Sequence, residues 1–341
     1  MHRIELDPNI SRVTLDGFAF PLGAYPVEQM SPLSGYYEEF EVADGGEGDA
    51  ASSPETSDEW EEWPDRFLFD VSITADRVRS LCRSLFALLP GRVYPILDVL
   101  GHDAYREIDP YIAYDPVGVE KFLDAVRWYG EWFFEDGMVG FGAMSVEPFF
   151  YVFIDEHKVV TIRVGIDNKE RVEKILKAYD LEPVPEIRAA DASEHEHRSV
   201  LVPRSGDEDL LVADDLIDIL RDAWRLELNV DATRNIDDDG RDLGITGWSC
   251  LVRCDPEHEA PPVFAEVVLA ADSLDAAERL VGEVIERAST EGGATWRGVR
   301  VLRAERVRPE KAAELGGVNA LPEDNVVLSV RWHNAGEHSS S

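Results

Sequence analysis

The sequence predicts an α+β fold of two α/β-sandwich domains with mainly antiparallel sheets. The chain of 341 residues is longer than a usual single domain, and its hydrophobic fraction of 44% is typical of a folded globular protein. The order strand, capped helix, strand is indicated over residues 66–100 and again over residues 263–307. A ferredoxin-like arrangement in each half would fit this order, so we expect two domains of that general type.

The first predicted domain covers residues 1–187. Residues 66–73 form a strand-like run, Thr74 is a suitable helix N-cap, and apolar residues then recur at helical spacing until Pro90. Further elements of this domain are expected as a strand over 92–100, an amphipathic helix over 119–134, a hairpin over 149–164 and a helix after Asn168.

A polar stretch over residues 188–209 is the predicted linker, because its composition offers little to a hydrophobic core. The second predicted domain covers residues 210–335, and residues 336–341 are expected to fray. Its helices are expected over 210–223, after Asp272 and after Pro309, and its strands over 225–230, 247–253, 263–270, 298–307 and 325–332.

An acidic segment over residues 38–65 contains no lysine or arginine, and we expect a mobile loop at about residues 43–58 within it. Trp60 and Trp63 lie in this segment among acidic residues. Aromatic anchors with surrounding charge are typical of peptides that dock on a basic, apolar groove. The alternative is that both tryptophans fold back as a lid over the predicted helix at 119–134, whose aromatic residues include Trp128 and Trp132.

The net charge of −36 disfavours nucleic acids and anionic membranes as partners, because both require clustered cations on the protein. No apolar run approaches the length that crosses a bilayer, and the N-terminus becomes acidic at once, unlike a signal peptide. The only cysteines are Cys82, Cys250 and Cys254, which is too few for a disulfide framework. We therefore expect a cytoplasmic protein that binds a protein partner or self-associates.

A calcium-like motif occupies residues 235–246. Asn235, Asp237 and Asp239 offer oxygen ligands at alternate positions, followed by a glycine. The match covers only the first half of an EF-hand loop, since Thr246 stands where that motif has a bidentate glutamate. Two readings stay open: a solvated hairpin loop and a site for a hard cation.

Other candidate groups are interpreted as structural. Cys250 and Cys254 would point to the same face of a strand about 13 Å apart, too far to share one zinc ion, so we expect buried thiols. His195 and His197 lack the helical spacing of a zinc protease motif, and we expect at most adventitious metal binding there. His102 and Asp103 are expected in a solvated polar loop.

Phosphate-binding glycine loops and the nucleophile elbow of serine hydrolases are absent from the sequence. We therefore expect a non-enzymatic interaction or regulatory protein with no cofactor. An enzyme whose site is assembled from distant residues and a calcium-stabilised binding module are the alternatives.

Overall fold

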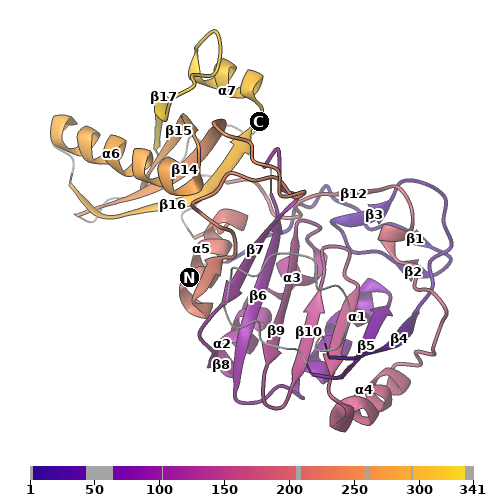
Figure 1. The fold of residues 1–341 in the computed structure, drawn as a ribbon. Coiled ribbons are helices and arrows are strands. Elements are labelled where there is room, and N and C mark those ends of the chain that lie inside the picture. Colours follow the sequence, from indigo (N-terminus) through magenta and orange to yellow (C-terminus); the bar gives the residue numbers. More distant parts are fainter. Residues whose placement is uncertain are drawn as a thin grey trace.

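The computed structural model describes residues 3–43, 64–101, 103–204, 209–257, 261–292 and 295–334. Over these ranges the chain is a mixed α+β protein with mostly antiparallel sheets, as the sequence predicts. Figure 1 shows a large sheet with helices behind it and a smaller sheet beside it with its own helices. None of the described helices is long and apolar enough to cross a membrane.

The large sheet has nine strands in the order β13-β7-β6-β9-β10-β11-β5-β4, with β8 also paired to β6. The strands are rich in β-branched and aromatic residues, and their burial alternates in most of them. Their bounds are β4 Gly35–Glu41, β5 Arg66–Ser72, β6 Arg92–Leu100, β7 Ile108–Ala113, β8 Val117–Gly118, β9 Val139–Ser145, β10 Phe150–Ile154, β11 Val160–Val164 and β13 Leu226–Leu228.

Five helices pack with this sheet around one hydrophobic core. They are α1 Ala75–Phe86, α2 Val119–Trp128, α3 Gly130–Glu135, α4 Ile166–Ala178 and α5 Ala213–Trp224. The predicted helix at 119–134 is divided between α2 and α3, with the break at Tyr129 and Gly130, where glycine is a poor helix former. Trp224 of α5 is buried in the same core and stacks on Phe133.

The small sheet has four antiparallel strands in the order β16-β14-β15-β17. Its elements are β14 Thr246–Pro256, β15 Val263–Ala271, α6 Leu274–Gly292, β16 Trp296–Val307, α7 Pro309–Gly316 and β17 Val326–Asn334. A second core lies between this sheet and α6. Cys250 and Cys254 of β14 are free and buried in it, which confirms the predicted buried thiols.

Short elements complete the described chain: β1 Thr14–Leu15, β2 Phe18–Ala19, β3 Ala24–Pro26, the 3-10 helix η1 Ala190–Ala192 and β12 His195–His197. Strand β12 pairs antiparallel with β3, so Glu196 lies opposite Tyr25. Residues 188–198, expected as part of a linker, are therefore hydrogen-bonded to the N-terminal residues beside the large sheet. The division into domains at residues 187 and 210 stays a prediction.

Candidate metal centre

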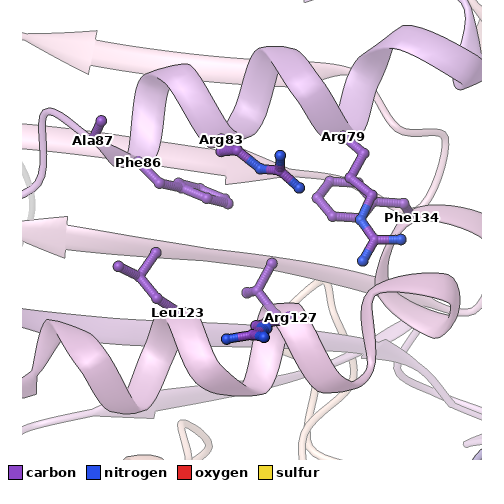
Figure 2. A pocket seen from close by; sticks show the side chains of 8 residues that line it. Arg79, Arg83, Phe86, Ala87, Leu123, Arg127 and Phe134 are labelled. Carbon is purple, nitrogen blue, oxygen red and sulfur yellow. The ribbon is translucent and has the colours of Figure 1, made fainter.

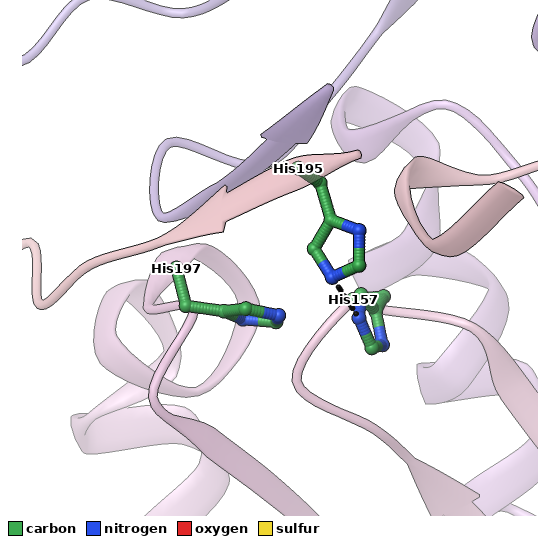
Figure 3. A group of neighbouring side chains, drawn as sticks. All are labelled: His157, His195 and His197. Atoms are coloured by element: carbon green, nitrogen blue, oxygen red, sulfur yellow. Dashed lines mark hydrogen bonds between the residues drawn. The ribbon is translucent and has the colours of Figure 1, made fainter. Parts of the chain in front are cut away.

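Three histidines from two separate segments meet beside the large sheet. His157 lies in the tight turn between β10 and β11, and His195 and His197 lie on β12. One ligand atom from each ring lies within 4.8 Å of the others, and the ring centroids are 4.7 to 4.8 Å apart. Figure 3 shows the three rings turned toward one another. Because successive side chains of a strand alternate between faces, His195 and His197 share one side of β12.

The outer nitrogens of two of these rings face acceptors. Nδ1 of His195 lies 2.7 Å from the Ser193 carbonyl oxygen, and Nδ1 of His197 lies 2.7 Å from the Gly137 carbonyl oxygen. A carbonyl oxygen only accepts, so both Nδ1 atoms carry hydrogen and donate it. The Nε2 atom of each neutral ring is then left with a free lone pair.

The third ring, His157, is held by carboxylates. The nearer carboxylate oxygens of Asp155 and Glu156 each lie 3.5 Å from its Nδ1. Its Nε2 lies 2.9 Å from Nε2 of His195. Two ring nitrogens this close require either a hydrogen-bonded hydrogen or a metal ion between them. A carboxylate behind the outer nitrogen of a histidine is the usual second layer of a metal site, because it fixes the ring and raises its basicity.

The electrostatics of the cluster favour a cation. Burial alone would lower the pKa of His157, but the hydrogen bond to Asp155 and the charges of Asp155 and Glu156 outweigh it and raise that pKa. Burial lowers the pKa of His197, and the neighbouring rings of His157 and His195 lower it further. His197, whose pKa is lowered, thus lies beside His157, which is held by carboxylates, and this arrangement suits a shared positive charge.

A close backbone contact sets the position of His197. Gly137 packs against Gly23 so tightly that a Cβ atom on Gly137 would overlap the Gly23 carbonyl group. The Gly23 amide donates to Glu135, and the Gly23 carbonyl accepts from the Arg198 amide at 2.8 Å. The same Gly137 supplies the carbonyl that holds His197, so this contact fixes the ring.

Gly137→Ala is therefore expected to lower the free energy of unfolding by about 1 to 3 kcal/mol, because the methyl group forces the two segments apart. Urea unfolding measures the change. Gly282 of α6 has open space around it, so Gly282→Ala is the matched control and should be neutral or stabilising. An unchanged urea midpoint for Gly137→Ala would show that the contact is not tight in solution.

A buried carboxylate anchors the chain directly after β12. Asp136 is fully buried and accepts hydrogen bonds from the Met138 amide at 2.8 Å, and from the Ser199 hydroxyl and Val200 amide at 2.9 Å. Burial raises its pKa, while these donors and Lys158 oppose the rise. The bonds to Ser199 and Val200 hold the end of the histidine-bearing segment against α3 and β9.

The tryptophans singled out in the sequence have different surroundings. Trp60 and Trp63 lie outside the described residues. Trp128 is the last residue of α2, and 61% of its surface is exposed. Trp132 is buried in the core and is 1% exposed. The structure does not bring Trp128 or Trp132 to the histidines, and their role in partner binding stays a prediction.

The predicted cation loop lies between β13 and β14. Asn235 is buried; its amide group donates to Gly244 and Thr246, and its oxygen accepts from Arg306 at 3.2 Å. One carboxylate oxygen of Asp237 accepts from the amides of Asp239 and Arg241. These oxygens therefore have protein donors, and calcium binding by Asn235, Asp237 and Asp239 stays a prediction.

His157 is the residue that the sequence interpretation missed. The signal available was the pair His195 and His197 two residues apart, which places both rings on one face of a strand. The helical spacing of zinc protease motifs does not describe two histidines on one face of a strand. Its partner comes from a turn 38 residues earlier in the chain, and no local spacing reveals that contact.

Comparison of the chain with protein-family models, with curated proteins and with solved structures gives no match.

Proposed function

We propose that this protein binds one divalent transition metal ion, with zinc as the first candidate, through Nε2 of His157, His195 and His197. The observation that carries the proposal is the convergence of three rings whose outer nitrogens all face oxygen acceptors. Imidazole nitrogen suits zinc, and three histidines with one exchangeable position are a known zinc ligand set. A bound cation would also take the place of the hydrogen between Nε2 of His157 and Nε2 of His195.

The position of the three histidines supports a structural role for the metal ion, in which it connects two separate segments of the chain. His157 belongs to the hairpin of β10 and β11 at the centre of the large sheet, while His195 and His197 belong to a segment held mainly by pairing with β3. A metal ion shared by these elements would join residues 188–198 to the sheet. Since the folded chain alone presents all three ligands together, binding would stabilise the folded state.

Cobalt(II) and zinc(II) titrations test the proposal. The metal-free chain is expected to bind one ion, with tetrahedral cobalt absorption and a raised melting temperature. His157→Asn, His195→Asn and His197→Asn should each weaken binding by about 100-fold or more, since even the loss of an outer-layer partner costs 10- to 100-fold. Glu196 lies on the opposite face of β12 and bonds Tyr25, so Glu196→Gln is the matched control.

The pH dependence of metal affinity provides a second measurement on the same site. Metal ligation requires deprotonated imidazole, so affinity is expected to fall steeply below about pH 6. Equal binding by the wild type and the three histidine variants would overturn the proposal. An equal change of metal affinity in the three histidine variants and in Glu196→Gln would also overturn the proposal.

We also propose, as a second function, the interaction or regulatory role that the sequence suggests. Its support is the largely exposed Trp128, because a large exposed aromatic side chain is typical of contact surfaces. The two-domain division is supported by two separate hydrophobic cores, and a ferredoxin-like character of the small sheet by the helices α6 and α7 that pack on it. The three free cysteines support a cytoplasmic location.

A further inference from the structure

A cavity between α1 and α2 combines three arginines with an apolar floor. Arg79 and Arg83 project from α1 one turn apart, and Arg127 projects from α2. The cavity has a volume of about 420 Å³, and its other lining residues are Phe86, Ala87, Leu123, Val126 and Phe134. Figure 2 shows the arginines on the two facing helices, with Phe86 and Phe134 near the space between them.

These arginines have no acidic partner among the described residues. Over the described ranges, no ion pair or hydrogen bond involves the guanidinium groups of Arg79, Arg83 or Arg127. Other arginines of the chain are paired, such as Arg12 with Glu135 and Arg300 with Asp218. In a protein of net charge −36, three arginines that no described residue pairs form a local positive field around one cavity, and this field attracts an anion.

The lining specifies the class of ligand. Guanidinium groups bind carboxylate and phosphate oxygens through paired hydrogen bonds. The phenyl rings and aliphatic side chains below them offer no polar partner, so they suit a hydrocarbon. A second cavity of about 680 Å³ shares Arg79 and Arg127 with the first and is lined by Trp128, Tyr129 and Glu131 among others. The shared arginines place the anionic group where the two spaces meet.

We propose that the cleft between α1 and α2 binds a small amphiphilic anion, with its head group on Arg79, Arg83 and Arg127 and its hydrocarbon body on Phe86, Leu123 and Phe134. The volume agrees with the 300 to 1,000 Å³ typical of ligand sites. Leu123 is 37% exposed without a ligand, and burial of this side chain by a hydrocarbon would contribute to affinity. The residues of this site differ from those of the histidine cluster, so the proposal does not rest on the proposed metal binding.

Calorimetric titration with decanoate and with decyl phosphate tests the proposal and distinguishes a carboxylate from a phosphate head group. Decanol and decyltrimethylammonium, with the same hydrocarbon, test the need for negative charge. We expect the anions to bind at least tenfold more tightly than either control compound. Each titration is repeated with a chelator, because a carboxylate could otherwise bind through a metal ion at the histidines.

Arginine variants locate the site. Arg79→Gln and Arg83→Gln should each weaken anion binding about tenfold, and the double variant more, since each removes a charge-assisted hydrogen bond. Arg287 is exposed on α6, far along the chain from the cleft, and Arg287→Gln is the matched control that should bind like the wild type. Leu123→Asp should abolish binding by placing a carboxylate on the apolar floor.

Three results would overturn the proposal. One is equal affinity for decanoate and decyltrimethylammonium, which would indicate non-specific hydrophobic binding. The second is anion binding that Arg79→Gln, Arg83→Gln and Arg287→Gln leave unchanged. The third is anion binding that the chelator abolishes. Helical content measured by circular dichroism verifies that each variant is folded.

Discussion

Arg306→Met is expected to lower the free energy of unfolding by about 3 to 5 kcal/mol, because it removes the nearer of the two cations beside a buried carboxylate and leaves only Arg106, at 3.9 Å. Arg306 of β16 is buried, and its Nε lies 3.0 Å from both carboxylate oxygens of Asp103. The Asp103 side chain is completely buried. The Arg306 amide also donates to Asp103 at 2.9 Å, so side chain and backbone hold the same carboxylate.

This ion pair connects distant parts of the chain. Asp103 follows β6 of the large sheet, and Arg306 belongs to the small sheet. The same guanidinium donates to Asn235 and to the Ile236 carbonyl in the predicted cation loop. Loss of the guanidinium would therefore remove its hydrogen bonds to Asn235 and Ile236 and leave the Asp103 carboxylate with backbone amide donors, which accounts for the large expected cost.

Urea unfolding of Arg306→Met and of Arg300→Met measures the effect. Arg300 lies on the same strand and pairs with Asp218 and Asp222, but its side chain is 42% exposed, so that variant should lose less than about 1 kcal/mol. The double variant Asp103→Leu with Arg306→Met should recover part of the loss, since it removes both charges. Similar losses for the two methionine variants would show that the Asp103 pair is not buried in solution.

Asp103 also shows where sequence reasoning was wrong. The sequence predicts a solvated polar loop around Asp103, because the neighbouring residues are charged and polar. The structure instead buries this carboxylate against Arg306, 203 residues later in the chain. A polar segment can be buried when a distant segment supplies its counter-charge, and composition carries no information about that partner.

Helices and strands whose sequence signals lie within one short stretch of chain were predicted well. Helix α1 follows the predicted capping position at Thr74, and strands β10 and β11 form the predicted hairpin with Ile154 opposite Val160. Apolar periodicity and turn residues set these elements within a short stretch of chain. The metal centre and the arginine-lined cleft depend instead on contacts between segments, such as β12 with β3 and α1 with α2. Such contacts follow from the packing of the whole chain.

Asp98→Asn is expected to stabilise the protein at neutral pH by roughly 3 kcal/mol. Asp98 lies half-buried in β6, and burial followed by the charge of Glu156 raises its pKa from 3.8 to about 6. Over the described residues no hydrogen bond or ion pair involves its carboxylate. Each pKa unit corresponds to about 1.4 kcal/mol, so holding this group ionised in the folded state costs roughly 3 kcal/mol.

The stability difference between Asp98→Asn and the wild type should depend on pH. Below pH 3.8 Asp98 is protonated in both the folded and the unfolded chain, and the cost is absent. As pH rises from 3.8 to about 6, the unfolded chain loses the proton first, so the wild type loses stability relative to Asp98→Asn, whose amide stays neutral. Above about pH 6 the difference between the two proteins should be constant.

Unfolding free energies of both proteins between pH 3.5 and 8 measure this difference, and effects of other titrating groups largely cancel in it. Glu227→Gln, at an exposed position of β13, controls for the removal of one negative charge from a chain of net charge −36. A stabilisation of Asp98→Asn no larger than that of Glu227→Gln would assign the gain to reduced overall repulsion and would contradict the burial of Asp98. A pH-dependent gain confined to Asp98→Asn would instead identify β6 as a place where the fold maintains an unpaired charge beside Tyr151, whose pKa burial raises to about 12.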